Sequence, residues 1–195
     1  MSELQNSSPA PLAQRENTKL GIWVFLGGEV IFFVSLILLI IFARLTQTDY
    51  DAQFRNHLSI PIIAINTFVL VTSSYFVVRA LAAISERDDQ KGLRNNLLMV
   101  IVLGLVFLAG QAFEWITLFG EGVGISSAYG SPFFNVTGIH GTHVFVGILW
   151  AIYLLVGQRR IPLTQATHIG VENFGLYWHF VDIVWIVLFT VIYLL

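Results

Sequence analysis

Five long apolar runs constrain the fold of this chain more than any other feature of its sequence. They cover residues 20–43, 61–84, 95–119, 138–156 and 172–194. A helix of roughly 20 apolar residues is long enough to cross a hydrocarbon core about 30 Å thick. Because lipid offers no hydrogen-bond partners to the backbone, a chain crosses it only as helices or as a closed barrel. The runs therefore predict an all-α integral membrane protein with five transmembrane helices in a bundle.

Composition agrees with this prediction and excludes several functions. Of the 195 residues, 56% are hydrophobic and 11% are charged, and the net charge of −2 provides no basic surface for nucleic acid. The chain has no cysteine, so thiolate metal sites, iron–sulfur clusters and disulfides are excluded. The polar residues 1–19 predict a disordered tail, followed by one transmembrane domain over residues 20–195.

Positive charges predict the orientation, because Lys and Arg concentrate on the cytoplasmic side of membrane proteins. If the five runs alternate in direction, one side holds Arg15, Lys19, Arg79, Arg87, Lys91, Arg94, Arg159 and Arg160. The other side holds Arg44 and Arg55. We therefore expect a cytoplasmic N-terminus and an external C-terminus.

Polar side chains inside the runs fall into two layers when distance from the middle of each run is converted to depth at 1.5 Å per residue. The outer layer lies roughly 6 to 10 Å beyond the midplane, and it contains Asn66, Glu114, His140 and His143. The inner, cytoplasmic layer contains Glu29, Arg79, His179 and Asp182. His168 and Glu172 are expected at the cytoplasmic edge.

These polar residues have a structural and a functional interpretation. A buried polar side chain can simply form a hydrogen bond between helices, which is the interpretation we adopt for Asn66. Carboxylates inside a membrane are rare and need a partner, so Glu29 and Asp182 are candidate functional residues. The expected pairs are Glu29 with His179 or Arg79, and His179 with Asp182 along one helix face.

Three functions can be tested against the positions of these residues. A haem or metal needs its imidazole ligands at one depth, but His143 and His179 differ by roughly 12 Å along the membrane normal. A series of acids and histidines could carry protons in a stand-alone transporter, although no broken helix marks a substrate site. Glycines such as Gly104, Gly110 and Gly147 instead allow close helix packing. Spacing alone favours an interaction subunit for other membrane proteins over a carrier.

Two specific motifs lie near the end of the chain. The first is "GIHGTHVFVG" at residues 138–147, and the second is "HIGVENFGLYWHFVDIVWIVLF" at residues 168–189. Both closely resemble the C-terminal half of subunit III of the haem-copper respiratory oxidases. Upstream, "LGIWVFLGGEVIFFVSL", "INTFVLVTSS", "GQAFEW" and "AYGSPFFNVTGIHG" are similar to other segments of that family. The resemblance places the family's buried glutamate at Glu29 and its Gln-Ala-x-Glu segment at Gln111 and Glu114.

The resemblance implies an accessory subunit of a proton-pumping terminal oxidase in the bacterial plasma membrane, a complex that reduces oxygen to water. No catalytic centre, haem or copper is expected in this chain, since the family's redox centres belong to partner subunits. The implied role is to pack on catalytic subunit I beside other oxidase subunits, organise membrane phospholipid, support proton uptake and stabilise turnover. The alternative remains a stand-alone proton-coupled membrane carrier.

The number of helices also bears on the resemblance. Many family members have seven helices, and the first two form one wall of a lipid-holding cleft. The five runs match the five-helix form found among bacterial quinol oxidases, so this chain alone is not expected to build that wall. For His179 and Asp182 we expect a buried hydrogen-bonded layer with Glu29 that holds the first helix against the fifth.

Overall fold

The chain folds into long membrane helices. The computed structural model describes residues 11–46, 59–127, 130–160 and 168–195. Within these ranges every regular element is helical, and five helices are long and apolar enough to cross a membrane. They are α1 (Pro11–Thr46), α3 (Ile60–Arg87), α4 (Gln90–Gly120), α5 (Gly130–Arg160) and α6 (Ile169–Phe189), which continues as the π-helix η2 (Thr190–Leu194). The all-α prediction with five transmembrane helices is confirmed.

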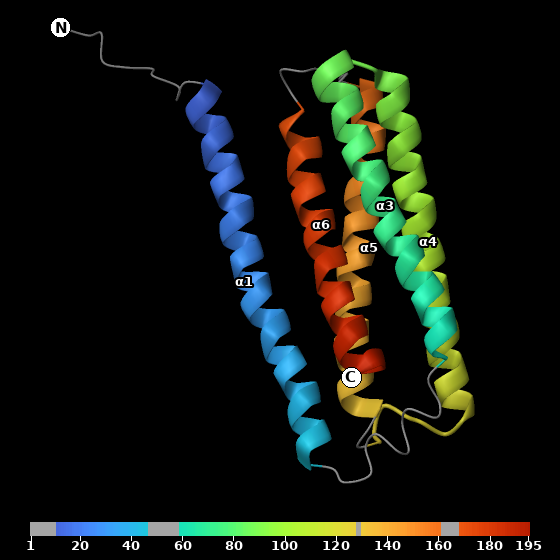
Figure 1. Cartoon of the computed structure of the whole chain (residues 1–195). Coiled ribbons are helices and arrows are strands. Elements are labelled where there is room, and N and C mark those ends of the chain that lie inside the picture. The colour runs from blue at the N-terminus through green and yellow to red at the C-terminus, as the bar shows by residue number, and fades with distance from the viewer. Residues whose placement is uncertain (1–10, 47–58, 128–129, 161–167) are drawn as a thin grey trace, which may run out of the picture.

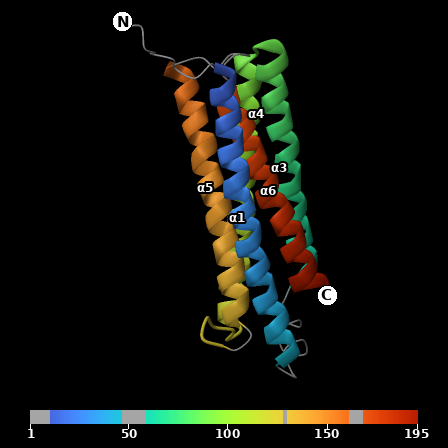
Figure 2. The ribbon, with the colours of Figure 1, turned by 90° about the vertical axis from the view of Figure 1, so that its left-hand side faces the viewer.

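Successive helices run in alternating directions, so the chain enters α1 and leaves η2 at opposite ends of the bundle (Figure 1). In the group formed by α3 to α6, α3 packs on α4 and α6, and α5 also packs on both. Outside this group, α1 packs on α5 and α6 (Figure 2). Half of the most apolar stretch of α6 is buried inside the chain, against 17% for α1. The central helix is therefore α6, and α1 is peripheral.

Helix α1 begins well before the apolar run at residue 20. It starts at Pro11, so residues 11–19 of the expected disordered tail are helical, and residues 1–10 lie outside the described part of the chain. Proline is tolerated in a first helical turn, where its missing N–H would have no partner. A helix of 36 residues is about 54 Å long. Its ends therefore extend beyond the hydrocarbon core.

Two aspartates connect α3 to α4. Asp88 adopts a left-handed conformation (φ +48°), and the Asp89 N–H donates to the Ala83 carbonyl at 2.9 Å, which ends α3. The Asp89 side chain then accepts hydrogen bonds from the backbone N–H groups of Lys91 (3.1 Å) and Gly92 (2.9 Å) and caps α4. Aspartate suits both positions, because it tolerates the left-handed region and its carboxylate is a good N-cap. This short corner sets α3 and α4 side by side.

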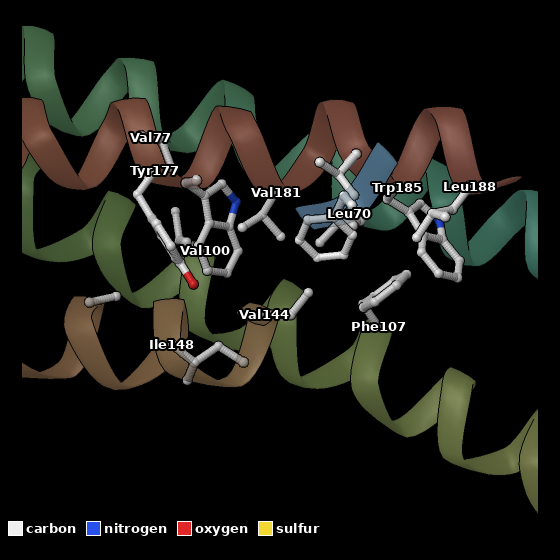
Figure 3. Close-up of a cluster of buried hydrophobic side chains, with 14 of the residues drawn as sticks. Leu70, Val77, Val100, Phe107, Val144, Ile148, Tyr177, Val181, Trp185 and Leu188 are labelled. Atoms are coloured by element: carbon white, nitrogen blue, oxygen red, sulfur yellow. The ribbon is translucent and has the colours of Figure 1, made fainter. Parts of the chain in front are cut away.

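Large side chains of α6 fill the interior. Figure 3 shows the buried cluster, which includes Leu70, Val77, Val100, Phe107, Val144, Ile148, Tyr177, Val181, Trp185 and Leu188. Trp178 is also fully buried, and its Nε1 donates to Ser73 Oγ at 2.8 Å. A Cβ at Gly147 would lie 2.6 Å from the Trp178 ring, and one at Gly104 would lie 3.1 Å from it. These two glycines therefore provide the space that the indole occupies.

Candidate functional site

Glu29 on α1 contacts α5. Its Oε2 lies 3.1 Å from Nε2 of His143, and both side chains are about one-fifth exposed. The edge of the Phe33 ring packs against the imidazole, with 5.0 Å between ring centroids. The expected pairing of Glu29 with His179 or Arg79 is therefore wrong.

A second hydrogen bond orients the His143 ring. Nδ1 lies 2.9 Å from the Ile139 carbonyl, which can only accept, so Nδ1 carries a proton and donates it. A hydrogen bond between Nε2 and Glu29 then needs one further proton, on either the imidazole or the carboxyl group. The imidazole therefore bonds its own helix through Nδ1 and α1 through Nε2.

Helix length explains why the depth calculation separated these two residues. The run 138–156 has its middle near residue 147, but α5 spans Gly130–Arg160, and its middle lies only two residues beyond His143. Glu29 lies at the middle of α1 (Pro11–Thr46). Both residues are therefore within about 3 Å of the middle of their helices. Because α5 begins before its apolar run, the middle of the helix lies closer to His143 than the middle of the run does.

His179 and Asp182 lie one turn apart on α6, and both contact Ser74 of α3. Ser74 Oγ is 2.9 Å from His179 Nδ1, and the Ser74 hydroxyl donates to Asp182 Oδ2. Asp182 is only 4% exposed. This contact joins α6 to α3, whereas we had expected one that joins α6 to α1. Ser74 was missed because a single serine in an apolar helix is an ordinary residue with no distinctive pattern.

The residue types at this contact are those of a nucleophilic triad, but their order differs. In a triad the imidazole lies between the hydroxyl group and the carboxylate, so that it removes the hydroxyl proton. Here the hydroxyl lies between the other two groups: it donates to Asp182 and accepts from His179 Nδ1. The serine is therefore not activated for attack, and the arrangement acts as a helix-to-helix hydrogen-bond network.

Glu114 forms a third buried contact, near the end of the bundle at which α4 ends. Its Oε2 accepts from Gln111 Nε2 at 2.7 Å and from the Tyr193 hydroxyl at 2.8 Å. Glu114 is 6% exposed, and Tyr193 is 1% exposed. The contact fixes η2 against α4. Tyr193 was missed because it lies in the last turn, where interfacial tyrosines are common.

The other residues of the predicted outer layer have separate partners. Asn66 Nδ2 donates to the Phe107 carbonyl at 3.0 Å and joins α3 to α4, as its structural interpretation predicted. Nε2 of His140, which is fully buried, lies 3.1 Å from the Val181 carbonyl and joins α5 to α6. The His140 ring packs on Trp185, with 4.8 Å between ring centroids. These side chains share a region of the bundle, but they do not form one network.

Residues at the ends of the bundle have ordinary roles. Glu172 forms an ion pair with Lys19 of α1 at 2.5 Å, and the His168 carbonyl accepts hydrogen bonds from the first turn of α6. Arg79 is exposed on α3 and donates to the Tyr75 hydroxyl at 3.2 Å, one turn earlier on the same helix. Arg44, near the end of α1, donates to the Val191 and Ile192 carbonyls of η2.

Helix α1 is thus held by polar contacts at three depths. The Lys19–Glu172 pair lies at one end, the Glu29–His143 pair near the middle, and the Arg44 contact at the other end. In the part of the chain that the structure describes, no three His, Asp or Glu side chains are placed to hold a metal ion. Chemically, these contacts can hold helices together and hold protons in place.

The Glu29–His143 contact yields a first prediction. Replacing Glu29 with leucine removes the hydrogen bond, and we expect a loss of about 0.6 to 1.7 kcal/mol of stability, the range for such bonds in membranes. Glu29→Gln keeps a bonding group and should lose less. Unfolding in mixed micelles, with His143→Leu completing a double-mutant cycle, isolates the pair. Glu16→Gln on the exposed start of α1 is the control. Strictly additive single effects would show that the pair contributes nothing.

The Ser74 contact yields a second prediction. Asp182→Ala leaves the Ser74 hydroxyl without its acceptor inside the bundle, and we expect a loss of about 1 to 3 kcal/mol. Ser74→Ala should have a similar effect, and the double variant should be little worse than either single one. Ser35→Ala is the control, because that exposed hydroxyl bonds only its own helix, at Ile31. Unchanged unfolding together with unchanged complex yield on blue-native gels would contradict this prediction.

Comparison with known proteins now decides the family. Residues 7–195 match the model of the family described as cytochrome c oxidase subunit III. The chain belongs to this family. The motif-based prediction of a subunit III chain of the haem-copper oxidases is confirmed, and with five membrane-spanning helices the chain is a multi-pass bacterial membrane protein.

Individual subunit III relatives agree. Cytochrome c oxidase subunit 3 of Corynebacterium diphtheriae is 35% identical over 187 residues, covering 94% of this chain and 91% of that protein. A probable cytochrome c oxidase subunit 3 of Mycobacterium bovis is 39% identical over 180 residues, covering 89% and 85%. A probable quinol oxidase subunit 3 of Staphylococcus aureus is 32% identical over 201 aligned residues, covering 100% and 97%. These relatives are named for two different electron donors, cytochrome c and quinol.

Proposed function

We propose that this chain is an accessory, non-redox subunit of a haem-copper terminal oxidase. The observation that carries the proposal is the subunit III match over residues 7–195. In this role the chain packs on the catalytic subunit, which holds the haem and copper and reduces oxygen to water. The other parts of the proposal are organising phospholipid, supporting proton uptake and stabilising the complex during turnover. The N-terminus lies in the cytoplasm, as the distribution of positive charges predicts.

The use of the embedded polar groups supports an accessory role. The Glu29, Asp182 and Glu114 carboxyl groups each bond a side chain of a neighbouring helix or turn within this chain. These helix contacts account for the acids without a pathway for a transported substrate. The chain also presents extensive apolar surface, including Leu20, Val24, Ile31 and Leu45 of α1, each more than 60% exposed. Such a surface can pack on another membrane subunit or on lipid.

Purification from the native membrane tests the proposal. A tag on this chain should bring down a complex with the reduced-minus-oxidised spectrum of haem and with oxygen-consuming activity. A strain that lacks the chain should assemble an oxidase that starts near its normal rate and loses activity faster during turnover. A colourless, stable protein that transports a solute on its own in vesicles would contradict the proposal and support the stand-alone proton-coupled carrier.

A further inference from the structure

A hollow of about 190 Å³ lies where α3 ends and α4 begins, and none of the contacts above accounts for it. Its lining combines small side chains with charged and amide ones, namely Ala82, Ala83, Gly92, Arg79, Arg87, Asp89 and Asn96. Pockets for drug-sized ligands start at about 300 Å³. The hollow therefore fits a small polar group better than a peptide or a large cofactor.

The charges of the lining favour an anion. Two arginines line the hollow against one acid, Asp89. The Asp89 carboxylate is already engaged as the N-cap of α4, where it accepts two backbone N–H bonds at 3.1 and 2.9 Å. Asn96 Nδ2 donates to the Gly92 carbonyl at 2.8 Å. A guanidinium group has five N–H donors, and the bond of Arg79 to the Tyr75 hydroxyl uses one of them.

The position of Arg79 favours an anionic ligand on energetic grounds. Arg79 lies eight residues before the end of α3, about 12 Å further into the span. It is exposed on the helix surface, and its guanidinium carbon lies 5.8 Å from the centre of the Tyr75 ring, one turn deeper. An arginine on the lipid-facing surface of a span is costly unless an anion or water reaches it. Phosphate oxygens pair well with guanidinium groups.

The surroundings favour a lipid phosphate over a free one. Tyr75 and Val78 beside Arg79 are 57% and 52% exposed, so they offer apolar surface for acyl chains next to the charge. Basic pockets between transmembrane helices at the cytoplasmic side are known to bind anionic headgroups.

We propose that the hollow between α3 and α4 binds the phosphate of an anionic phospholipid. Arg79 and Arg87 hold the phosphate oxygens, and the acyl chains lie along the exposed face of α3 beside Tyr75 and Val78. The site deepens the lipid-organising part of the proposed function and rests on it. It lies on a corner that this chain builds alone.

Native mass spectrometry of the full chain, purified in its complex, tests the site. Phosphatidylglycerol, phosphatidylcholine and inorganic phosphate are added separately. Phosphatidylglycerol should bind at least tenfold more tightly than phosphatidylcholine, and inorganic phosphate should not displace it. The variant Arg79→Gln with Arg87→Gln should bind phosphatidylglycerol at least tenfold more weakly. Arg94→Gln removes an exposed charge at the same end of the bundle but outside the hollow, so it should bind as before.

Several outcomes would overturn the proposal. Equal binding of the two lipids, or unchanged binding by the double glutamine variant, would show that the arginines select no headgroup. Displacement of the lipid by inorganic phosphate would replace the lipid site with a free-anion site. If the double variant does not fold, Arg79→Lys with Arg87→Lys keeps both charges and should bind with intermediate affinity, and unchanged binding by it would count against phosphate recognition by the guanidinium groups. Haem in the same preparation reports separately on the proposed function.

Discussion

Replacing Trp178 with alanine is expected to be among the most destabilising single changes in this chain. The indole is fully buried, packs on Phe174 with 5.6 Å between ring centroids, and donates to Ser73 Oγ at 2.8 Å. Its loss leaves a cavity and a serine without its donor. Tryptophan-to-alanine changes in cores cost about 3 to 5 kcal/mol. Because lipid is as apolar as the core, the transfer contribution is small, and we expect the lower end, about 3 kcal/mol.

Thermal and denaturant unfolding in detergent measure this loss. For a chain of this size, about 3 kcal/mol corresponds to a Tm lowered by roughly 6 to 12 °C. Trp23→Ala is the matched control, because it removes the same side chain from the surface of α1, where Trp23 is 59% exposed. Trp178→Phe should lose less, since it keeps part of the ring volume. Equal losses for Trp178→Ala and Trp23→Ala would show that packing at Trp178 does not hold α6 in place.

Replacing Gly147 with valine should damage the same contact from the opposite side. A Cβ at this position would lie 2.6 Å and 2.8 Å from Trp178 ring carbons and 3.2 Å from Tyr177. Neither ring can move freely, because both residues are buried. Overpacking of this kind costs about 1 to 3 kcal/mol. We expect Gly147→Ala to fall in that range, and Gly147→Val to exceed it and to lower the yield of monodisperse protein.

A control variant and a compensating double variant test this prediction. Gly28→Val makes the same change on α1, where a Cβ would meet nothing within 4 Å, so it should be tolerated, since valine also has a better helix propensity than glycine. Combining Gly147→Ala with Trp178→Phe should restore part of the stability, because the smaller ring makes room for the methyl group. If Gly147→Val and Gly28→Val behave alike in size-exclusion chromatography and unfolding, α5 and α6 are not held at the distance that the structure gives.

The spans themselves could be predicted from the sequence because length and hydropathy act locally. In lipid, a stretch of about 20 apolar residues must satisfy its backbone N–H and C=O groups within its own helix, whatever its neighbouring helices are. Depth was less predictable. The helices continue beyond their apolar runs, for example through the turns at residues 130–137 of α5. These turns shift the middle of each helix away from the middle of its apolar run, so His143 lies level with Glu29.

Most partners of the polar residues could not be predicted from the sequence. Ser74, Tyr193 and Lys19 complete the contacts of Asp182, Glu114 and Glu172. Nothing in their local sequence distinguishes them from other serines, tyrosines and lysines near membrane helices. A signal did exist for Arg44, because an arginine in the last turn of a helix suits nearby carbonyls. Its carbonyl partners belong to η2, the far end of the chain.

By itself, therefore, the sequence determined the five membrane helices, their alternating order and the subunit III family. It also identified the acids and imidazoles that need partners inside the membrane. Only the tertiary structure decided that Glu29 pairs with His143 and that Asp182 bonds Ser74. The physical reason is that sequence gives position along each helix axis, whereas a hydrogen bond also requires two helices to be neighbours and to be rotated so that the two side chains meet.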